Sequence, residues 1–140
     1  MKRMRFVIPM LSFAAAIVLL QFVFYIGYVP TESMEPTIPA GSKVIGIRII
    51  QDLSVGDIVV FKYNGTNMVK RIAAGPGEEV QIQGEKTIVP KDCYYVLGDN
   101  CINSFDSRYR KNPFIHRAEV IAGAKIIFND MKIKMIYKSQ

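Results

Sequence analysis

The chain has 140 residues, half of them hydrophobic, and a formal net charge of +6 at pH 7. This length suits one modest domain with an appendage. The basic residues are scattered, and they form neither an aromatic-interleaved stripe nor a known nucleic-acid motif, so no nucleic-acid partner is expected. Cys93 and Cys101 lack the paired Cys and His partners of a zinc site, so no metal is expected. Whether they form a disulfide outside the cell is left open.

The segment from Phe6 to Tyr28 contains no charged residue. A helix of about 23 residues, rising ~1.5 Å per residue, is long enough for the ~30 Å hydrocarbon core of a bilayer. The sequence therefore predicts a transmembrane anchor at 6–28, with Tyr25 and Tyr28 at a membrane interface. A cleaved secretory signal is disfavoured, because the apolar run is long and 26–30 offers no Ala-x-Ala site.

Charge predicts the orientation of this anchor. Basic residues precede it and acidic residues follow it: Lys2, Arg3 and Arg5 before, Glu32 and Glu35 after. Because basic flanks favour the cytoplasmic side, the N-terminus is expected in the cytoplasm and the domain outside. The expected division is a cytoplasmic tail at 1–5, the transmembrane anchor at 6–28 and an extracytoplasmic β domain at 29–140.

After the anchor, short runs rich in β-branched residues alternate with turn signals. The expected strands are 43–50, 57–63, 68–73, 79–83, 86–89, 94–97 and 120–128, and the basic tail after Lys132 is either a last strand or a frayed end. Asn64-Gly65 and Gly84-Glu85 predict hairpin turns, and Gly123 marks a candidate bulge. The predicted fold is mainly β: a single N-terminal transmembrane helix followed by a compact antiparallel β-sandwich or partly open barrel.

Three polar clusters lie among these runs. Ser33, between Pro30 and Pro36, directly follows the anchor on a constrained turn. Lys70 lies inside an apolar strand, and a dense polar stretch at 98–108 follows a strand. Taken singly, the three clusters indicate only a serine in a turn, a solvated lysine in a strand, and a loop at 98–108 that is held by Asx-turns.

Together, the clusters indicate nucleophilic catalysis. A serine hydroxyl is a weak nucleophile that needs a base within hydrogen-bond distance. The single histidine, His116, lies in a polar segment and is expected at the surface. A lysine can replace histidine if its ordinary pKa of ~10.4 falls toward neutrality, and burial among apolar strands produces a shift of that size. Lys70 is therefore the candidate base for Ser33.

The chain resembles the bacterial type I signal peptidases, Ser-Lys enzymes that remove signal peptides from exported proteins. The resemblance covers the anchor and most of the outer domain, with four of the family's sequence boxes in order. The boxes are 33–37, 56–60, Lys70-Arg71-Ile72 with Pro76-Gly77, and Gly98-Asp99-Asn100 with Ser104, Asp106, Ser107 and Arg108. There are two departures. Ala74-Gly75 stands where the family more often has glycine-leucine, and Cys101 stands where arginine or another polar residue is common.

The resemblance implies a role for each matched residue. Ser33 is the expected nucleophile and Lys70 the expected general base. The Ser33 N–H and the Thr31 hydroxyl are expected to form the oxyanion hole, and Ser104 is expected to orient Lys70. Asp106 and Arg108 are expected to form an ion pair that supports the site. Asp99 and Arg71 are expected to lie nearby as further supporting residues.

The resemblance also implies partners. Exported preproteins would bind in an extended form at a sheet edge and be cut after small-x-small sites. Shallow apolar pockets for the small side chains are expected from Val29, Pro30, Ile38, Met68 and Val69. We expect a single-pass cell-membrane protein in contact with lipid, acting as a monomer with its catalytic domain outside and without a metal or organic cofactor.

Two alternatives stay open. A specialised relative, dedicated to one pilus, peptide or conjugation substrate, fits the same sequence, because few residues separate Gly77 from Gly98 where larger relatives insert a second domain. An inactive membrane-tethered β-domain that binds exported peptides is the other, and the intact Ser33 and Lys70 argue against it. A self-cleaving Ser-Lys repressor is disfavoured, because such proteins carry a DNA-binding domain where this chain has an apolar segment.

Overall fold

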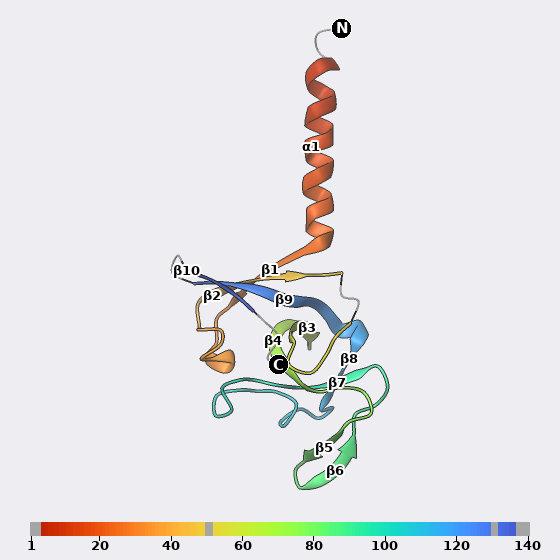
Figure 1. Cartoon of the computed structure of the whole chain (residues 1–140), viewed down its shortest axis with the longest axis vertical. Helices are drawn as coiled ribbons and strands as arrows, with labels where there is room; N and C mark the ends of the chain where they lie inside the picture. The colour runs from red at the N-terminus through yellow and green to blue at the C-terminus, as the bar shows by residue number, and fades with distance from the viewer. Residues whose placement is uncertain (1–3, 50–51, 130–131, 137–140) are drawn as a thin grey trace.

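The computed structural model describes residues 4–49, 52–129 and 132–136. One N-terminal helix, α1 (Met4–Val23), stands apart from a β domain (Figure 1). Parts of three sequence predictions lie outside the described residues. They are Lys2 and Arg3 of the cytoplasmic tail, Ile50 at the end of a predicted strand, and 137–140 in the basic tail.

The β domain is built from antiparallel strands. They are β1 (Phe24–Val29), β2 (Ser42–Ile47), β3 (Ile58–Tyr63), β4 (Thr66–Ala74), β5 (Glu79–Ile82), β6 (Glu85–Ile88), β7 (Cys93–Leu97), β8 (Phe114–His116), β9 (Val120–Asn129) and β10 (Lys132–Met135). Two 3₁₀ helices, η1 (Glu32–Met34) and η2 (Arg117–Glu119), complete the elements of the described residues. The main sheet has the order β1-β2-β9-β3-β4-β7-β8, with β10 paired to β9, while β5 and β6 form a separate hairpin. The prediction of a mainly β domain after one N-terminal helix is confirmed.

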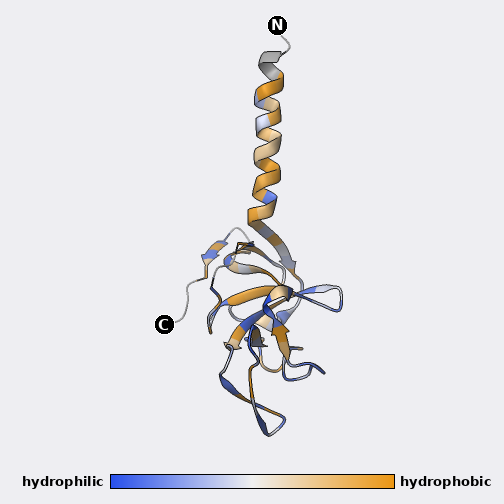
Figure 2. Ribbon diagram, turned by 90° about the vertical axis from the view of Figure 1, so that its right-hand side faces the viewer, coloured by the Kyte–Doolittle hydropathy of each residue, from blue (hydrophilic) through white to orange (hydrophobic). Residues whose placement is uncertain are grey.

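The helix ends at Val23, earlier than the predicted anchor, which extended to Tyr28. Residues 24–29 instead form β1, which pairs with β2 along its whole length. The aromatic and β-branched residues of this segment suit a strand, and pairing with β2 satisfies its backbone groups. Figure 2 shows α1 as mostly hydrophobic along its length. In the part of the chain that the structure describes, no helix combines the length and hydrophobicity needed to cross a bilayer.

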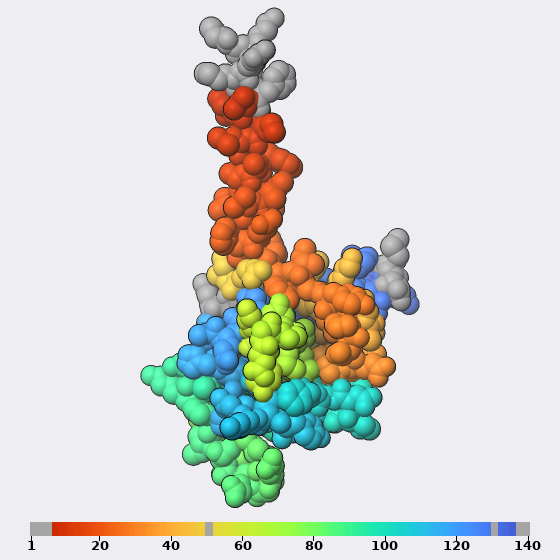
Figure 3. All heavy atoms as spheres, turned by 180° about the vertical axis from the view of Figure 1, so that it is seen from behind, coloured from red at the N-terminus to blue at the C-terminus, as the bar shows by residue number. Residues whose placement is uncertain are grey.

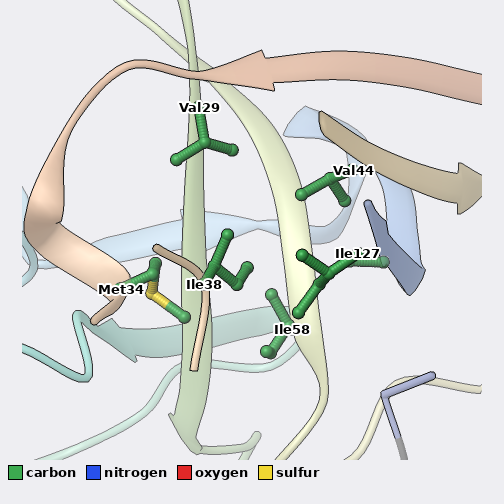
Figure 4. Close-up of a cluster of buried hydrophobic side chains, with 7 residues drawn as sticks. Val29, Met34, Ile38, Val44, Ile58 and Ile127 are labelled. Atoms are coloured by element: carbon green, nitrogen blue, oxygen red, sulfur yellow. The ribbon is translucent and has the colours of Figure 1, made fainter. Parts of the chain in front are cut away.

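The core lies on both sides of β3, whose first four residues are buried. Neighbouring side chains of a strand point to opposite faces, so Ile58 and Val59 enter different clusters. The first core cluster (Figure 4) is Val29, Met34, Ile38, Val44, Ile58, Ala124 and Ile127. The second core cluster is Val59, Phe61, Ile72, Tyr94, Val96 and Ile115. Met34, the residue after Ser33, is fully buried, so the first core cluster holds the turn that carries Ser33.

Turn chemistry explains which hairpin predictions succeed. Asn64 and Gly65 both adopt positive φ (47° and 81°) between β3 and β4, which confirms the predicted turn. The predicted turn at Gly84-Glu85 is wrong by one residue, because Gln83 and Gly84 are the pair with positive φ (52° and 91°). Glu85 is the first residue of β6.

The last strands also differ in part from prediction. Gly123 is not at a bulge: it pairs with both Ile47 and Val59, and the register shifts lie on either side of it. In the described part of the basic tail, Lys132–Met135 forms strand β10. Strand β1 and the short strand β8 were not predicted from the sequence.

Candidate active site

Two elements distant in sequence bring Ser33 and Lys70 together. Ser33 lies in η1, where the Glu35 N–H donates to the Glu32 carbonyl at 3.0 Å. Lys70 lies in β4, paired with Val59 of the central strand. The Lys70 Nζ donates to the Ser33 Oγ at 2.7 Å. A hydroxyl and a basic amine at this distance can exchange a proton directly.

The surroundings of Lys70 favour its neutral form. Ser33 is 6% exposed and Lys70 is 3% exposed. Burial lowers the pKa of Lys70 from 10.5 to about 8, although the negative charges of Asp106 and Asp99 act in the opposite direction. Since a pKa of about 8 leaves roughly a tenth of the amine neutral at pH 7, the base form is populated under ordinary conditions.

The two carboxylates near Lys70 are each paired with an arginine. Arg71 Nη2 lies 2.6 Å from Asp99 Oδ2, and Arg108 Nη2 lies 2.8 Å from Asp106 Oδ2. Burial alone would raise the pKa of both carboxyl groups, but hydrogen bonds from their arginines lower it below its ordinary value. Both carboxylates are therefore ionised and largely neutralised, which limits how strongly they stabilise a charged amine at position 70.

Two further hydroxyls lie near the Ser33–Lys70 pair. Thr31 Oγ1 lies 3.3 Å from Ser33 Oγ. The buried Ser104 hydroxyl helps to lower the pKa of Asp106, but it is not placed for a regular hydrogen bond and has no such partner among the described residues. A hydrogen bond from Ser104 to Lys70 is accordingly not seen.

Asn100 holds the turn that carries Ser33 in place, a role that was not predicted from the sequence. Its backbone N–H donates to the Ser33 carbonyl at 3.1 Å, and its Nδ2 donates to the Glu32 carbonyl at 3.2 Å. Figure 3 shows the segment after β7 packed directly against the segment that contains η1. The polar stretch at 98–108 was the available signal, but only the fold shows which residue in it reaches Ser33.

Gly98 lies in the closest contact of the site. A Cβ at this position would overlap with the Ser104 hydroxyl and would lie 2.5 Å from the Ser33 carbonyl oxygen. Its own N–H donates to Asp106 Oδ2 at 3.0 Å. The segments that carry Ser33 and Ser104 leave no room for a side chain at position 98, so glycine is required there.

Replacement of Gly98 by alanine is expected to reduce kcat/KM by about 100-fold, because a displacement of ~1 Å in a catalytic group can cost that much. Gly75→Ala is the matched control, since its Cβ would meet only Glu78 Oε2 at 3.8 Å. Steady-state kinetics of both variants measure the effect. Similar rates for the two variants would contradict the close-contact explanation.

The predicted pocket residues fall into two groups. Val29 and Ile38 are buried in the first core cluster and Val69 packs against it, whereas Met68 packs against the second core cluster. Pro30 is exposed. Of the other residues considered, Cys93 and Cys101 are free. His116 is exposed, and its Nδ1 accepts a hydrogen bond from the Ala118 N–H.

Comparison with known proteins gives one consistent family. The family model described as "Signal peptidase, peptidase S26" matches residues 2–89 and 82–129. "Probable signal peptidase I-2" of Synechocystis sp. is 32% identical to this chain. The matched region covers 76% of this chain and 64% of that relative's length. "Signal peptidase I" of Leptolyngbya laminosa is 29% identical over 84% of this chain and 75% of the relative. "Signal peptidase I" of Bacillus amyloliquefaciens is 29% identical over 81% of this chain and 80% of the relative.

Proposed function

The chain belongs to the signal peptidase family, peptidase S26, and we propose that it is a membrane-anchored serine endopeptidase that removes N-terminal signal peptides from exported preproteins. The observation that carries this proposal is the 2.7 Å contact between Lys70 Nζ and Ser33 Oγ inside the protein. A buried lysine with a lowered pKa, hydrogen-bonded to a serine, is the arrangement that an activated nucleophile requires. Both residues come from one chain, which supports a monomer as the active unit.

In the proposed mechanism, neutral Lys70 accepts the Ser33 proton as Ser33 Oγ attacks the scissile carbonyl carbon. The negative charge that develops on the carbonyl oxygen is stabilised by the Ser33 N–H and the Thr31 hydroxyl. The leaving amine takes up the proton, and an ester to Ser33 remains. Water, deprotonated by Lys70, then attacks that ester and releases the signal peptide from Ser33.

The substrate is proposed to bind in an extended form and to present small side chains on either side of an intervening residue. Pro30, Met68 and Val69 lie close in sequence to the two catalytic residues and are the proposed pocket walls. Val29 and Ile38 are proposed to support these walls from the protein interior, because both are buried in the first core cluster, which holds the Ser33 turn. No metal or organic cofactor takes part in this scheme.

Incubation of the detergent-solubilised full chain with a preprotein tests the function. We expect a shortened product whose new N-terminus, read by sequencing, follows a small-x-small site. Acylation of Ser33 by a serine-reactive penem should block the reaction and add the inhibitor's mass to the chain. If a panel of preproteins is bound but left intact, the chain is a peptide-binding domain and the proposal is wrong.

Replacement of Thr31 by valine is expected to lower kcat by about 100-fold with a smaller effect on KM, because an oxyanion donor acts mainly in the transition state. Thr31→Ser keeps the hydroxyl and should retain most of the activity. Steady-state kinetics of the two variants give the comparison. An unchanged kcat in the valine variant would show that Thr31 is not part of the oxyanion hole.

We further propose that helix α1 attaches the domain to the cell membrane as a single-pass anchor, with the N-terminus in the cytoplasm and the catalytic domain outside. Support comes from the apolar side chains that α1 exposes, among them Met10, Leu11 and Phe22, each at least 70% exposed. Resistance to alkaline carbonate extraction, and protease sensitivity only from the outer side, are the expected results.

A further inference from the structure

Arg110 is a buried cation without the hydrogen-bond partners that such a group usually has. It lies two residues after the polar stretch at 98–108 and is only 7% exposed. Its Nε and Nη1 atoms are buried and have no hydrogen-bond partner among the described residues. Buried donors without partners reduce stability, so another kind of contact must hold this side chain in place.

The contacts of Arg110 are with two aromatic rings of β3. Its guanidinium carbon lies 4.0 Å from the centroid of the Tyr63 ring and 5.5 Å from the centroid of the Phe61 ring. A guanidinium over the face of an aromatic ring is attracted by the negative charge of that face. Phe61 belongs to the second core cluster, and Tyr63 packs against that cluster. Arg110 is therefore attached to the central strand of the sheet.

Tyr63 contacts both ends of the segment 105–110. Arg110 ends this segment, and Phe105 begins it, with its ring centroid 6.2 Å from that of Tyr63. Phe105 is 51% exposed whereas Arg110 is buried, so the arginine makes the more enclosed of the two contacts. Removal of its guanidinium would leave Tyr63 in contact with only one end of the segment.

The middle of the segment carries a charge that acts on Lys70. The Ser107 N–H donates to the Val96 carbonyl at 3.1 Å, and the Val96 N–H donates to Ser107 Oγ at 3.0 Å. Asp106, the residue before Ser107, is the carboxylate with the largest electrostatic effect on Lys70. The position of the segment therefore determines how close this carboxylate lies to the amine.

Strand register places Arg110 on the face of the sheet that carries Lys70. In the β3–β4 pair, Phe61 lies opposite Met68 and Val59 lies opposite Lys70. Since alternate residues of a strand share a face, Phe61 and Lys70 are on one face. The guanidinium over the Phe61 ring is thus packed onto the surface from which the amine extends.

We propose that Arg110 is a positioning residue, which through Tyr63 holds the segment 105–110 over this face and keeps water from the Lys70 amine. The inference rests on the proposed function, in which Lys70 is the base. Two carboxylates and their arginine partners are the charged groups that act on this amine: Asp106 with Arg108, and Asp99 with Arg71.

The pH dependence of cleavage by Arg110→Met tests the proposal. Without the guanidinium, the segment loosens, water reaches the amine, and the pKa of Lys70 should rise from about 8 toward 10.5. We expect the acid limb of kcat/KM to move up by about one pH unit, which lowers the neutral fraction, and hence the rate at pH 7, about tenfold. Near pH 10 the rate should be close to that of the unsubstituted chain.

Three further variants separate position from charge. Tyr63→Leu keeps the arginine but removes the ring, and it should move the acid limb as far as Arg110→Met does. Tyr63→Phe keeps the ring and should restore the original profile. Lys111→Met removes a positive charge from the next residue, which is exposed, and should move nothing.

Two results would overturn the inference. A shift in Arg110→Met that is missing in Tyr63→Leu would mean that the arginine acts only through its charge. A rate loss of the same size at every pH, in both variants, would mean that the contact supports the fold but does not position the base.

The inference and the proposed function fail in different ways. A ¹³C NMR titration of the lysine Cε atoms in the detergent-solubilised full chain follows Lys70 without turnover, and loss of its signal in Lys70→Arg assigns it. A chain that cleaves no preprotein, but whose Lys70 titrates at higher pH in Arg110→Met, keeps the positioning role and loses the peptidase function. A chain that cleaves preproteins, but whose Lys70 titration and acid limb do not move in Arg110→Met, keeps the function and loses the inference.

Discussion

Replacement of Ser33 by alanine is expected to reduce kcat/KM by at least about 10⁴-fold, because no other group in the proposed mechanism can form the covalent intermediate. The residual rate should reflect only substrate binding and oxyanion stabilisation, which persist when a nucleophile is removed. Cleavage of a preprotein, followed over long incubations at high enzyme concentration, measures this residual rate. Mass spectrometry should also find no acyl-enzyme.

Ser42→Ala is the matched control for this variant. Ser42 is buried like Ser33, and its Oγ donates to the Pro39 carbonyl at 2.6 Å. Ser33→Ala loses the hydrogen bonds of Ser33 Oγ with Lys70 and Thr31, and Ser42→Ala loses its one bond. Because each such bond is worth about 1 kcal/mol, both variants should remain folded, and only Ser33→Ala should lose activity. A Ser33→Ala enzyme that retains substantial cleavage would refute Ser33 as the nucleophile.

Replacement of Lys70 by methionine is expected to reduce kcat/KM by about 10³-fold or more at every pH, because the general base is lost. In the unsubstituted chain, only neutral Lys70 accepts the proton. With a pKa of about 8, kcat/KM should therefore rise about tenfold per pH unit well below pH 8 and level off above it. Lys70→Arg keeps the positive charge but cannot act as a base, and it should be equally inactive. A rate that stays flat down to pH 5 would exclude this role for Lys70.

The Lys70→Met substitution should also stabilise the fold. The pKa of Lys70 falls from 10.5 to about 8 on folding because of burial, so the unfolded chain binds more protons between these two values. Stability therefore rises with pH through this window, by about 3 kcal/mol from this group. Lys70→Met removes that cost, so we expect a higher Tm than the unsubstituted chain below pH 8 and a vanishing difference near pH 10.5. Lys62→Met, at an exposed position of β3, is the control for loss of a lysine side chain that is not buried. A lower Tm for Lys70→Met at pH 7 would contradict the proposed desolvation of Lys70.

Much of the candidate site was predictable because it depends on residue types in a fixed order. Ser33 between two prolines and Lys70 within an apolar strand each indicate their local conformation, and the strand signals on both sides of Asn64-Gly65 locate β3 and β4. The length of the helix was not predictable from composition. Residues 6–23 and 24–28 are equally free of charge, and only the pairing of β1 with β2 separates them.

The order of residues already shows which groups are available for chemistry: a serine on a constrained turn, a lysine among apolar residues, and a polar stretch with carboxylates and arginines. Local preferences suffice for this, because turns and strands are set by neighbouring residues. The folded chain adds that Lys70 meets Ser33 across 37 positions, that Arg71 pairs with Asp99, and that Gly98 leaves room for the Ser33 carbonyl. Those relations arise from strand register and packing between segments far apart in the chain, which no local pattern encodes.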